Sequence, residues 1–195
     1  MDIQNKNRKL LKKNHVYHET MEHDACGVGL VASTEGLKSR KVVEYGIEAL
    51  KAVWHRGAID ADGKTGDGAG IHIEIPNDFF AEKIEITGHE HDNSDLCVGM
   101  IFLPRNDFGG QEQCRSIVES ELTKKNFNIY GWRQVPVDPS VLGEKAEQTR
   151  PEITQVLFTH NDKSIHGKDL ERALYETRRK IEKEALRNQL NNFYI

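Results

Sequence analysis

Leu96–Leu103 is the longest strongly apolar run in this chain of 195 residues. A polar stretch precedes the run and Pro104 follows it, which predicts a buried β-strand of ordinary length. The run is far shorter than the roughly 20 residues that cross a bilayer, so we expect no membrane-spanning segment. The chain must therefore enclose this strand among other elements of a globular domain.

Apolar residues at helical spacing predict three helices, over residues 40–53, 111–125 and 169–187. Two strands are expected before the long apolar run. One is the glycine-rich apolar segment 26–32, and the other is 71–75, where isoleucines alternate with polar residues.

Two later segments, 127–137 and 153–159, also have a strand pattern, and Asp138-Pro139 between them predicts a turn or a short helix. Strands and helices do not alternate regularly along the chain. We therefore predict an α+β layered fold rather than a doubly wound parallel sheet. The length suits one domain of ordinary size.

Charge and cysteine content exclude several classes of protein. Acidic residues outnumber basic ones by 31 to 27, so we expect no nucleic-acid partner. Cys26, Cys97 and Cys114 are too few for a disulfide framework and contain no CxxC pair for zinc. Cys97 and Cys114 fit core positions. Reduced thiols and the lack of a secretory signal indicate a cytoplasmic protein.

Two patterns suggest binding sites but have simpler interpretations. Residues 58–65 nearly match a phosphate-binding loop, yet Ala58 replaces its first glycine and three nearby aspartates would repel phosphates. The cluster His89-Glu90-His91-Asp92 offers metal-ligand side chains, but consecutive residues of an extended loop point to opposite sides. We interpret it as a solvated turn and expect no metal site.

Cys26 is the strongest candidate for a catalytic group, because it begins a predicted strand directly after the polar residues 1–25. A buried core cysteine is the simpler alternative, and a protease-like pair with His55 has no identifiable orienting residue. Cleavage after Ala25 would give one residue both a thiol and a free α-amine. An α-amine has a pKa of about 7.7–8.0, so it could act as general base for the thiol.

Three motifs stand out in the first half of the chain: ACGVG at 25–29, WHRGA at 54–58 and TGDGAGI at 65–71. Together they resemble the class II glutamine amidotransferase domain that begins the large chain of glutamate synthases. The last two motifs are specific to glutamate synthases, whereas CGVG and HRG suit the wider amidotransferase class. Further matches lie at residues 75–76, 79–80 and 131–136.

This resemblance implies an N-terminal-nucleophile hydrolase fold, an αββα sandwich that would be incomplete at the C-terminus of this sequence. Residues 1–25 would be a propeptide, and residues 26–195 the leading part of the amidotransferase domain. Cys26 would attack the side-chain amide of L-glutamine, release ammonia and leave a thioester for water to hydrolyse. Arg56 would bind the α-carboxylate of glutamine with its two-pronged guanidinium group. The other substrate-binding positions implied are His55, Gly57, Gly66, Asp67 and Gly68.

The resemblance also implies partners outside this sequence. Ammonia would pass to 2-oxoglutarate in synthase domains of the same chain, which would hold FMN and an iron–sulfur cluster, and a small NADPH-dependent subunit is a further candidate partner. We expect no cofactor in this chain itself. The family's oxyanion-hole Asn-Gly pair lies beyond the matched span, so these 195 residues alone are expected to be inactive or nearly so. A binding-only module and a class II amidotransferase of another pathway stay open as alternatives.

Overall fold

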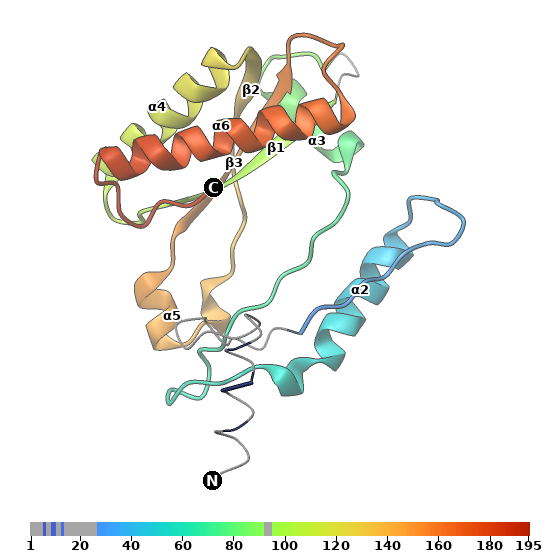
Figure 1. Ribbon diagram of the computed structural model, residues 1–195, viewed down its shortest axis with the longest axis vertical. Coiled ribbons are helices and arrows are strands. Elements are labelled where there is room, and N and C mark those ends of the chain that lie inside the picture. The colour runs from blue at the N-terminus through green and yellow to red at the C-terminus, as the bar shows by residue number, and fades with distance from the viewer. Residues whose placement is uncertain (1–5, 7–8, 11–12, 14–26, 92–94) are drawn as a thin grey trace. The chain divides into compact units, whose positions relative to one another are not determined.

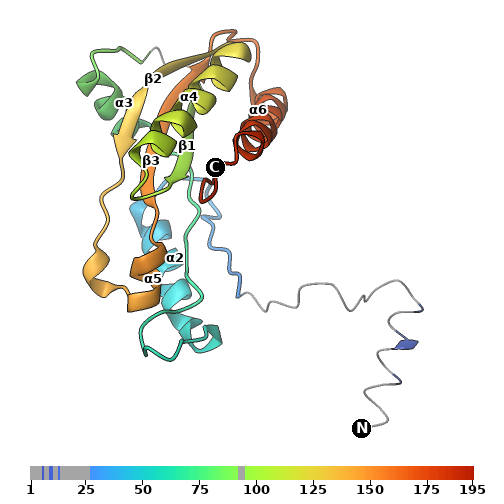
Figure 2. The same ribbon diagram turned by 90° about the vertical axis from the view of Figure 1, so that its left-hand side faces the viewer.

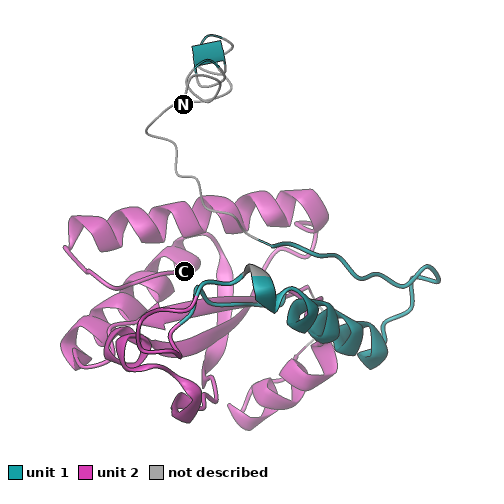
Figure 3. Cartoon of the chain, turned by 90° about the horizontal axis from the view of Figure 1, so that it is seen from below, with its two compact units in different colours: residues 1–58, 66–71 teal, residues 59–65, 72–195 magenta. Residues whose placement is uncertain are grey.

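The computed structural model describes residues 27–91 and 95–195, together with residues 6, 9, 10 and 13 (Figure 1). It divides into two compact units (Figure 3). Unit 1 comprises residues 1–58 and 66–71, and unit 2 comprises residues 59–65 and 72–195. No helix in the described parts of the chain is long and apolar enough to cross a membrane.

Unit 1 contains the helix α2 (Arg40–Ala52) and the short 3-10 helix η1 (Trp54–Arg56). The side chain of Ser39 caps α2 by accepting from the backbone N–H of Lys41, which satisfies a donor that has no partner within the helix. The predicted helix over 40–53 is therefore confirmed to within one residue. Its half-buried residues follow the helical spacing on which the prediction rests, at Val42, Val43, Gly46, Ile47 and Leu50.

The strands predicted over residues 26–32 and 71–75 are wrong for the described residues of these segments, which belong to no strand. Val28 and Leu30 are 94% and 92% exposed, and Ile71 is 48% exposed. Their apolar residues favour extended backbone, but a strand also needs a neighbour to complete its hydrogen bonds. Neither segment has a pairing partner among the residues that the structure describes.

Unit 2 is built on three antiparallel strands, β1 (Leu96–Leu103), β2 (Phe127–Gln134) and β3 (Glu152–His160). Their order is β1-β3-β2, so β3 lies in the centre and pairs with both neighbours (Figure 1). The register of β2 shifts at a bulge next to Gly131. All three strands were predicted; β1 has the expected bounds, whereas β2 ends three residues earlier than expected.

Helices cover both faces of this sheet (Figure 2). One face packs against α4 (Phe108–Lys124) and α6 (Gly167–Arg187), and the other against α3 (Asn77–Ile86). The sequence predicted α4 and α6 but not α3. Helix α4 begins three residues before its predicted start, because the Asp107 side chain accepts from the N–H of Gly110 and stabilises a glycine-containing first turn.

The main core lies between the sheet and the helices α4 and α6. Cys97 and Cys114 belong to it and are buried, as predicted. Burial raises the pKa of the Cys97 thiol to about 12 and also raises that of Cys114. Both thiols therefore stay protonated and act as small apolar side chains. The largest fully buried residues of this core are Ile101, Leu103, Val118, Val156 and Ile181.

The architecture is thus α+β with an antiparallel sheet, as the order of elements predicted. An αββα sandwich contains a second sheet packed on the first. The described residues form one three-stranded sheet, so the sandwich stays a prediction.

Candidate functional site

Cys26, the predicted nucleophile, lies outside the residues that the structure describes. The other predicted site residues all belong to unit 1. They occupy two short segments, residues 55–57 and 66–68, which an intervening loop separates in the sequence.

The first segment is a hydrogen-bonded turn directly after α2. His55 is exposed and lies in η1, and Arg56, of which the structure describes only the backbone, is the last residue of that helix. The N–H of Gly57 donates to the carbonyl oxygen of Trp54 at 3.0 Å and ends the helix. Trp54 itself is 74% exposed. One tight turn therefore holds the backbone of three predicted substrate-binding residues.

Asp67 joins the second segment to the first. Its Oδ2 accepts from the backbone N–H of Ala58 at 2.8 Å. A Cβ at Gly66 would lie 3.3 Å from the carbonyl oxygen of Ala58, so the two backbones approach closely there. Gly68 has a φ of +84°, a conformation that glycine adopts at little cost. The structure thus brings the two predicted segments side by side, although they are some ten residues apart in sequence.

Residues 59–65, which we call the 59–65 turn, connect the two segments and belong to unit 2. The N–H of Asp60 donates to the carbonyl oxygen of Thr65 at 2.8 Å. The side chain of Asp62 accepts from the N–H groups of Lys64 and Thr65, at 3.0 and 2.7 Å, and from the hydroxyl of Thr65. This hydroxyl and the two amides hold the pKa of Asp62 well below its usual range. Amides that would face a phosphate in a phosphate-binding loop donate here to a carboxylate.

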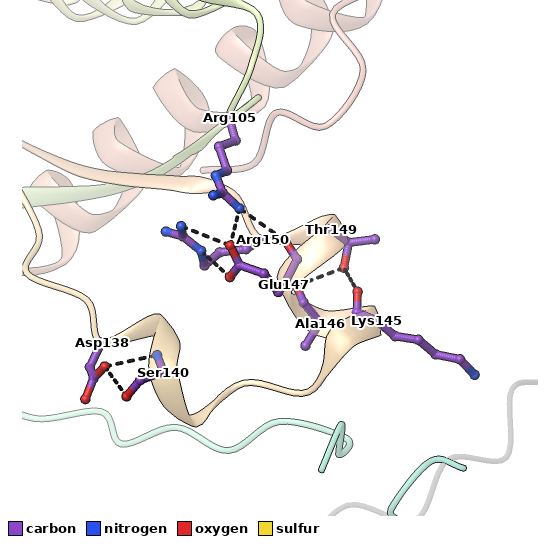
Figure 4. Close-up of polar contacts among 8 residues, drawn as sticks. All are labelled: Arg105, Asp138, Ser140, Lys145, Ala146, Glu147, Thr149 and Arg150. Atoms are coloured by element: carbon purple, nitrogen blue, oxygen red, sulfur yellow. Dashed lines mark hydrogen bonds and ion pairs between the residues drawn. The ribbon is translucent and has the colours of Figure 1, made fainter. Parts of the chain in front are cut away.

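The connection between β2 and β3 contains the 3-10 helix η2 (Pro139–Val141), which confirms the short helix or turn predicted at Asp138-Pro139. It also contains the short helix α5 (Glu144–Thr149), which the sequence did not predict. Glu147 fixes this helix (Figure 4). Arg105 donates to its carboxylate at 2.5 Å and to its carbonyl oxygen at 3.2 Å. Arg150 donates to the same carboxylate at 2.9 Å. The hydrogen bonds from Arg150 and then Arg105 lower the pKa of Glu147.

We expect Glu147→Gln to flatten the loss of stability in acid. Because the pKa of Glu147 is lower in the folded state, its ion pairs stabilise the fold fully above the ordinary glutamate pKa of about 4.3. The contribution disappears as the pH falls through the folded-state value. Urea unfolding of wild type and variant between about pH 7 and pH 3 should give midpoints that differ near neutrality and converge in acid.

Glu144→Gln is the matched control on the same helix, since Glu144 accepts only a long hydrogen bond of 3.4 Å from Gln148 among the described contacts. Equal effects of the two substitutions at every pH would contradict the role of the Arg105–Glu147–Arg150 cluster.

The histidine cluster is only in part the solvated turn that the sequence predicted. His89 is exposed, but His91 is half-buried. Both rings stand edge-on to Tyr130, with centroid distances of 6.1 and 5.9 Å. Asp92 lies outside the described residues. Within the described ranges no three His, Cys, Asp or Glu side chains are placed to hold a metal ion. These histidines pack against an aromatic ring of β2.

Comparison with known proteins decides the family. The family model of class-II glutamine amidotransferases matches residues 26–195. The chain belongs to this family. The amidotransferase motifs at residues 54–58 and 65–71 are those that the structure brings together through Asp67 and Ala58.

This amidotransferase spans only a small part of the length of the glutamate synthases it is compared with here. It is 51% identical over 189 residues to the glutamate synthase (NADPH) large chain of Azospirillum brasilense, covering 97% of the chain and 12% of that protein. It is 38% identical over 176 residues to the chloroplastic ferredoxin-dependent glutamate synthase 2 of Arabidopsis thaliana, covering 89% of the chain and 11% of that protein. The ferredoxin-dependent glutamate synthase 2 of Synechocystis is 37% identical over 175 residues, with the same coverage of 89% and 11%.

The described cysteines do not fit the iron–sulfur cluster that the resemblance implies for a complete glutamate synthase. Such clusters are held by several thiolates. Cys97 and Cys114 are buried among core side chains, and their raised pKa values keep them protonated.

Proposed function

We propose that this chain is the glutamine-hydrolysing part of a glutamate synthase and that it releases ammonia from L-glutamine with Cys26 as the nucleophile. The observation that carries the proposal is the amidotransferase match over residues 26–195, whose first residue is that cysteine. The 51% identity to a glutamate synthase large chain supports the choice of pathway.

The proposed chemistry needs one proton acceptor close to the thiol. After removal of residues 1–25, the α-amine of Cys26 takes the thiol proton, and the sulfur attacks the side-chain amide carbon of glutamine. The same amine then gives the proton to the departing nitrogen, which leaves as ammonia. Water hydrolyses the resulting γ-glutamyl thioester, releasing glutamate and restoring the thiol. An α-amine suits this role because its pKa lies near neutrality, at about 7.7–8.0.

Substrate binding is assigned to the two segments that Asp67 joins. The guanidinium group of Arg56 binds the α-carboxylate of glutamine by paired hydrogen bonds. His55 and Gly57 shape the turn that presents this arginine, and Gly66, Asp67 and Gly68 form the facing segment. The hydrogen bond from Ala58 to Asp67, at 2.8 Å, supports this role because it restrains both segments before substrate arrives.

The ammonia is proposed to react with 2-oxoglutarate in synthase domains that follow in the same polypeptide and contain FMN and an iron–sulfur cluster. The chain is 51% identical to the glutamate synthase (NADPH) large chain, but only 38% and 37% identical to the two ferredoxin-dependent glutamate synthases. This difference favours a small NADPH-dependent subunit as the partner over ferredoxin.

The proposal is tested on the chain expressed together with the sequence that follows it in its gene. Mass spectrometry of the purified protein should find Cys26 at the N-terminus. Incubation with 6-diazo-5-oxo-norleucine, an electrophilic glutamine analogue, should add one label to that residue and stop ammonia release. An active enzyme that retains Met1 would contradict the mechanism. A protein that binds glutamine but neither reacts with the analogue nor releases ammonia would be a binding-only module instead.

A further inference from the structure

Lys145 of α5 forms an ion pair with the 59–65 turn. Its Nζ lies 2.8 and 2.7 Å from the two carboxylate oxygens of Asp60, although the two residues are 85 positions apart. The side chains are 61% and 37% exposed, so the pair is a surface contact rather than part of the core. It holds the beginning of the turn to the first residues of α5.

Gly143, the residue before α5, holds the end of the same turn. A Cβ at this position would lie 2.2 Å from the hydroxyl oxygen of Thr65, 2.4 Å from Oδ2 of Asp62 and 2.5 Å from the backbone N of Thr65. All three distances are far shorter than van der Waals contact. The backbone of Gly143 and the 59–65 turn can therefore meet only because residue 143 has no side chain.

Core packing does not hold the 59–65 turn in place, so its contacts with Gly143 and Lys145 do. Ile59, its one large apolar side chain, is 63% exposed. Helix α5, in contrast, is firmly held, because Arg105 next to β1 and Arg150 at its end both bind Glu147 (Figure 4). The turn is thus attached to a helix that is itself attached to the sheet.

We propose that Gly143 and Lys145 are positioning residues for glutamine binding, acting through the 59–65 turn. The inference rests on the proposed function of the two segments that flank the turn. Peptide bonds join the turn to Ala58 on one side and to Gly66 on the other, and only two residues separate it from Arg56. A displacement of the turn therefore moves the backbone of both segments at once. Neither Gly143 nor Lys145 touches substrate.

The test measures steady-state ammonia release by the chain with its natural continuation. Lys145→Met is expected to raise KM for glutamine about threefold, the effect of losing one exposed ion pair, while kcat stays close to wild type. Lys145→Arg keeps the ion pair and should keep the wild-type KM. Gly143→Ala should lower kcat/KM about a hundredfold, because it forces the turn to move by roughly an ångström.

A charge reversal separates positioning from simple destabilisation. Lys145→Asp and Asp60→Lys should each raise KM, and the double variant should restore it, because the ion pair re-forms with its charges exchanged. Arg187→Met is the matched control, since Arg187 pairs with Glu184 at nearly the same exposure, 59% and 35%. It should leave KM and kcat unchanged.

Two failures are distinguishable. A wild type that releases no ammonia overturns the proposed function. A fully active wild type whose Lys145→Met and charge-reversed variants keep its KM overturns the positioning role alone, even if the variants lose thermal stability. Should Gly143→Ala fail to fold, the Lys145 and Asp60 variants decide the question, because their exposed pair lies outside the core.

Discussion

Cys26→Ala is expected to reduce ammonia release from glutamine by about four orders of magnitude or more, measured on the chain with its natural continuation. Removing a nucleophile from an enzyme that works through a covalent intermediate leaves only the rate enhancement from binding and polarisation. The variant should still bind glutamine, because Arg56 and the segments joined by Asp67 are unchanged. Isothermal titration calorimetry would measure this affinity separately from turnover.

Cys114→Ala is the matched control, since it removes a thiol that is fully buried and has a raised pKa. It should lower stability but leave the activity of each folded molecule unchanged. Normal turnover by Cys26→Ala would end the thioester mechanism. Normal turnover by protein in which the bond between Ala25 and Cys26 is intact would end the role of the α-amine.

The same mechanism fixes the direction of the pH dependence. The α-amine must be unprotonated to accept the thiol proton, so kcat/KM should rise with pH through its pKa, about 7.7–8.0 for an ordinary α-amine, and then level off. An activity that falls over this range would require a different base.

The sequence correctly predicted helices and strands whose apolar residues pack within unit 1 or unit 2 against neighbouring elements of the same chain. The strand Leu96–Leu103 and the helix Arg40–Ala52 are examples, and both were found within one residue. The segments 27–32 and 71–75 have an equally clear apolar pattern but no partner among the described residues. A pattern predicts which backbone conformation is favoured, whereas a strand also depends on a second chain segment.

The candidate site likewise contains residues that the sequence could indicate and residues that only the folded chain reveals. The motifs around Arg56 and Asp67 could be found by reading the sequence, because each is contiguous. Lys145 could not, since only the folded chain shows that it meets Asp60 across 85 residues. Gly143 could not be found either, because the short helix that follows it was not predicted from the sequence. Its ordinary φ of −75° shows that space, and not backbone conformation, requires glycine there.

Ile101→Ala is expected to lower the free energy of unfolding of the sheet unit by about 2–5 kcal/mol, the range for truncating a fully buried aliphatic side chain. Ile101 is 0% exposed. It lies on β1 opposite Thr154 of β3 and packs into the core beneath α4 and α6. Those helices frame the cavity that truncation would leave, and they cannot close it without breaking their own contacts with the sheet. The loss is a large part of the about 5–15 kcal/mol that stabilises a typical domain.

Met100→Ala provides the comparison on the same strand, because adjacent residues of a strand point to opposite faces of the sheet. Met100 is 40% exposed, so its truncation should cost about 1 kcal/mol or less. Urea unfolding followed by circular dichroism would measure both variants, with equal m-values as evidence that the same unit unfolds. Equal losses at the two positions would mean that the face under α4 and α6 is not the main core. A large loss confined to Ile101→Ala would show that the core beneath α4 and α6 stabilises the sheet unit. The 59–65 turn, whose Ile59 is 63% exposed, depends instead on its surface contacts with α5.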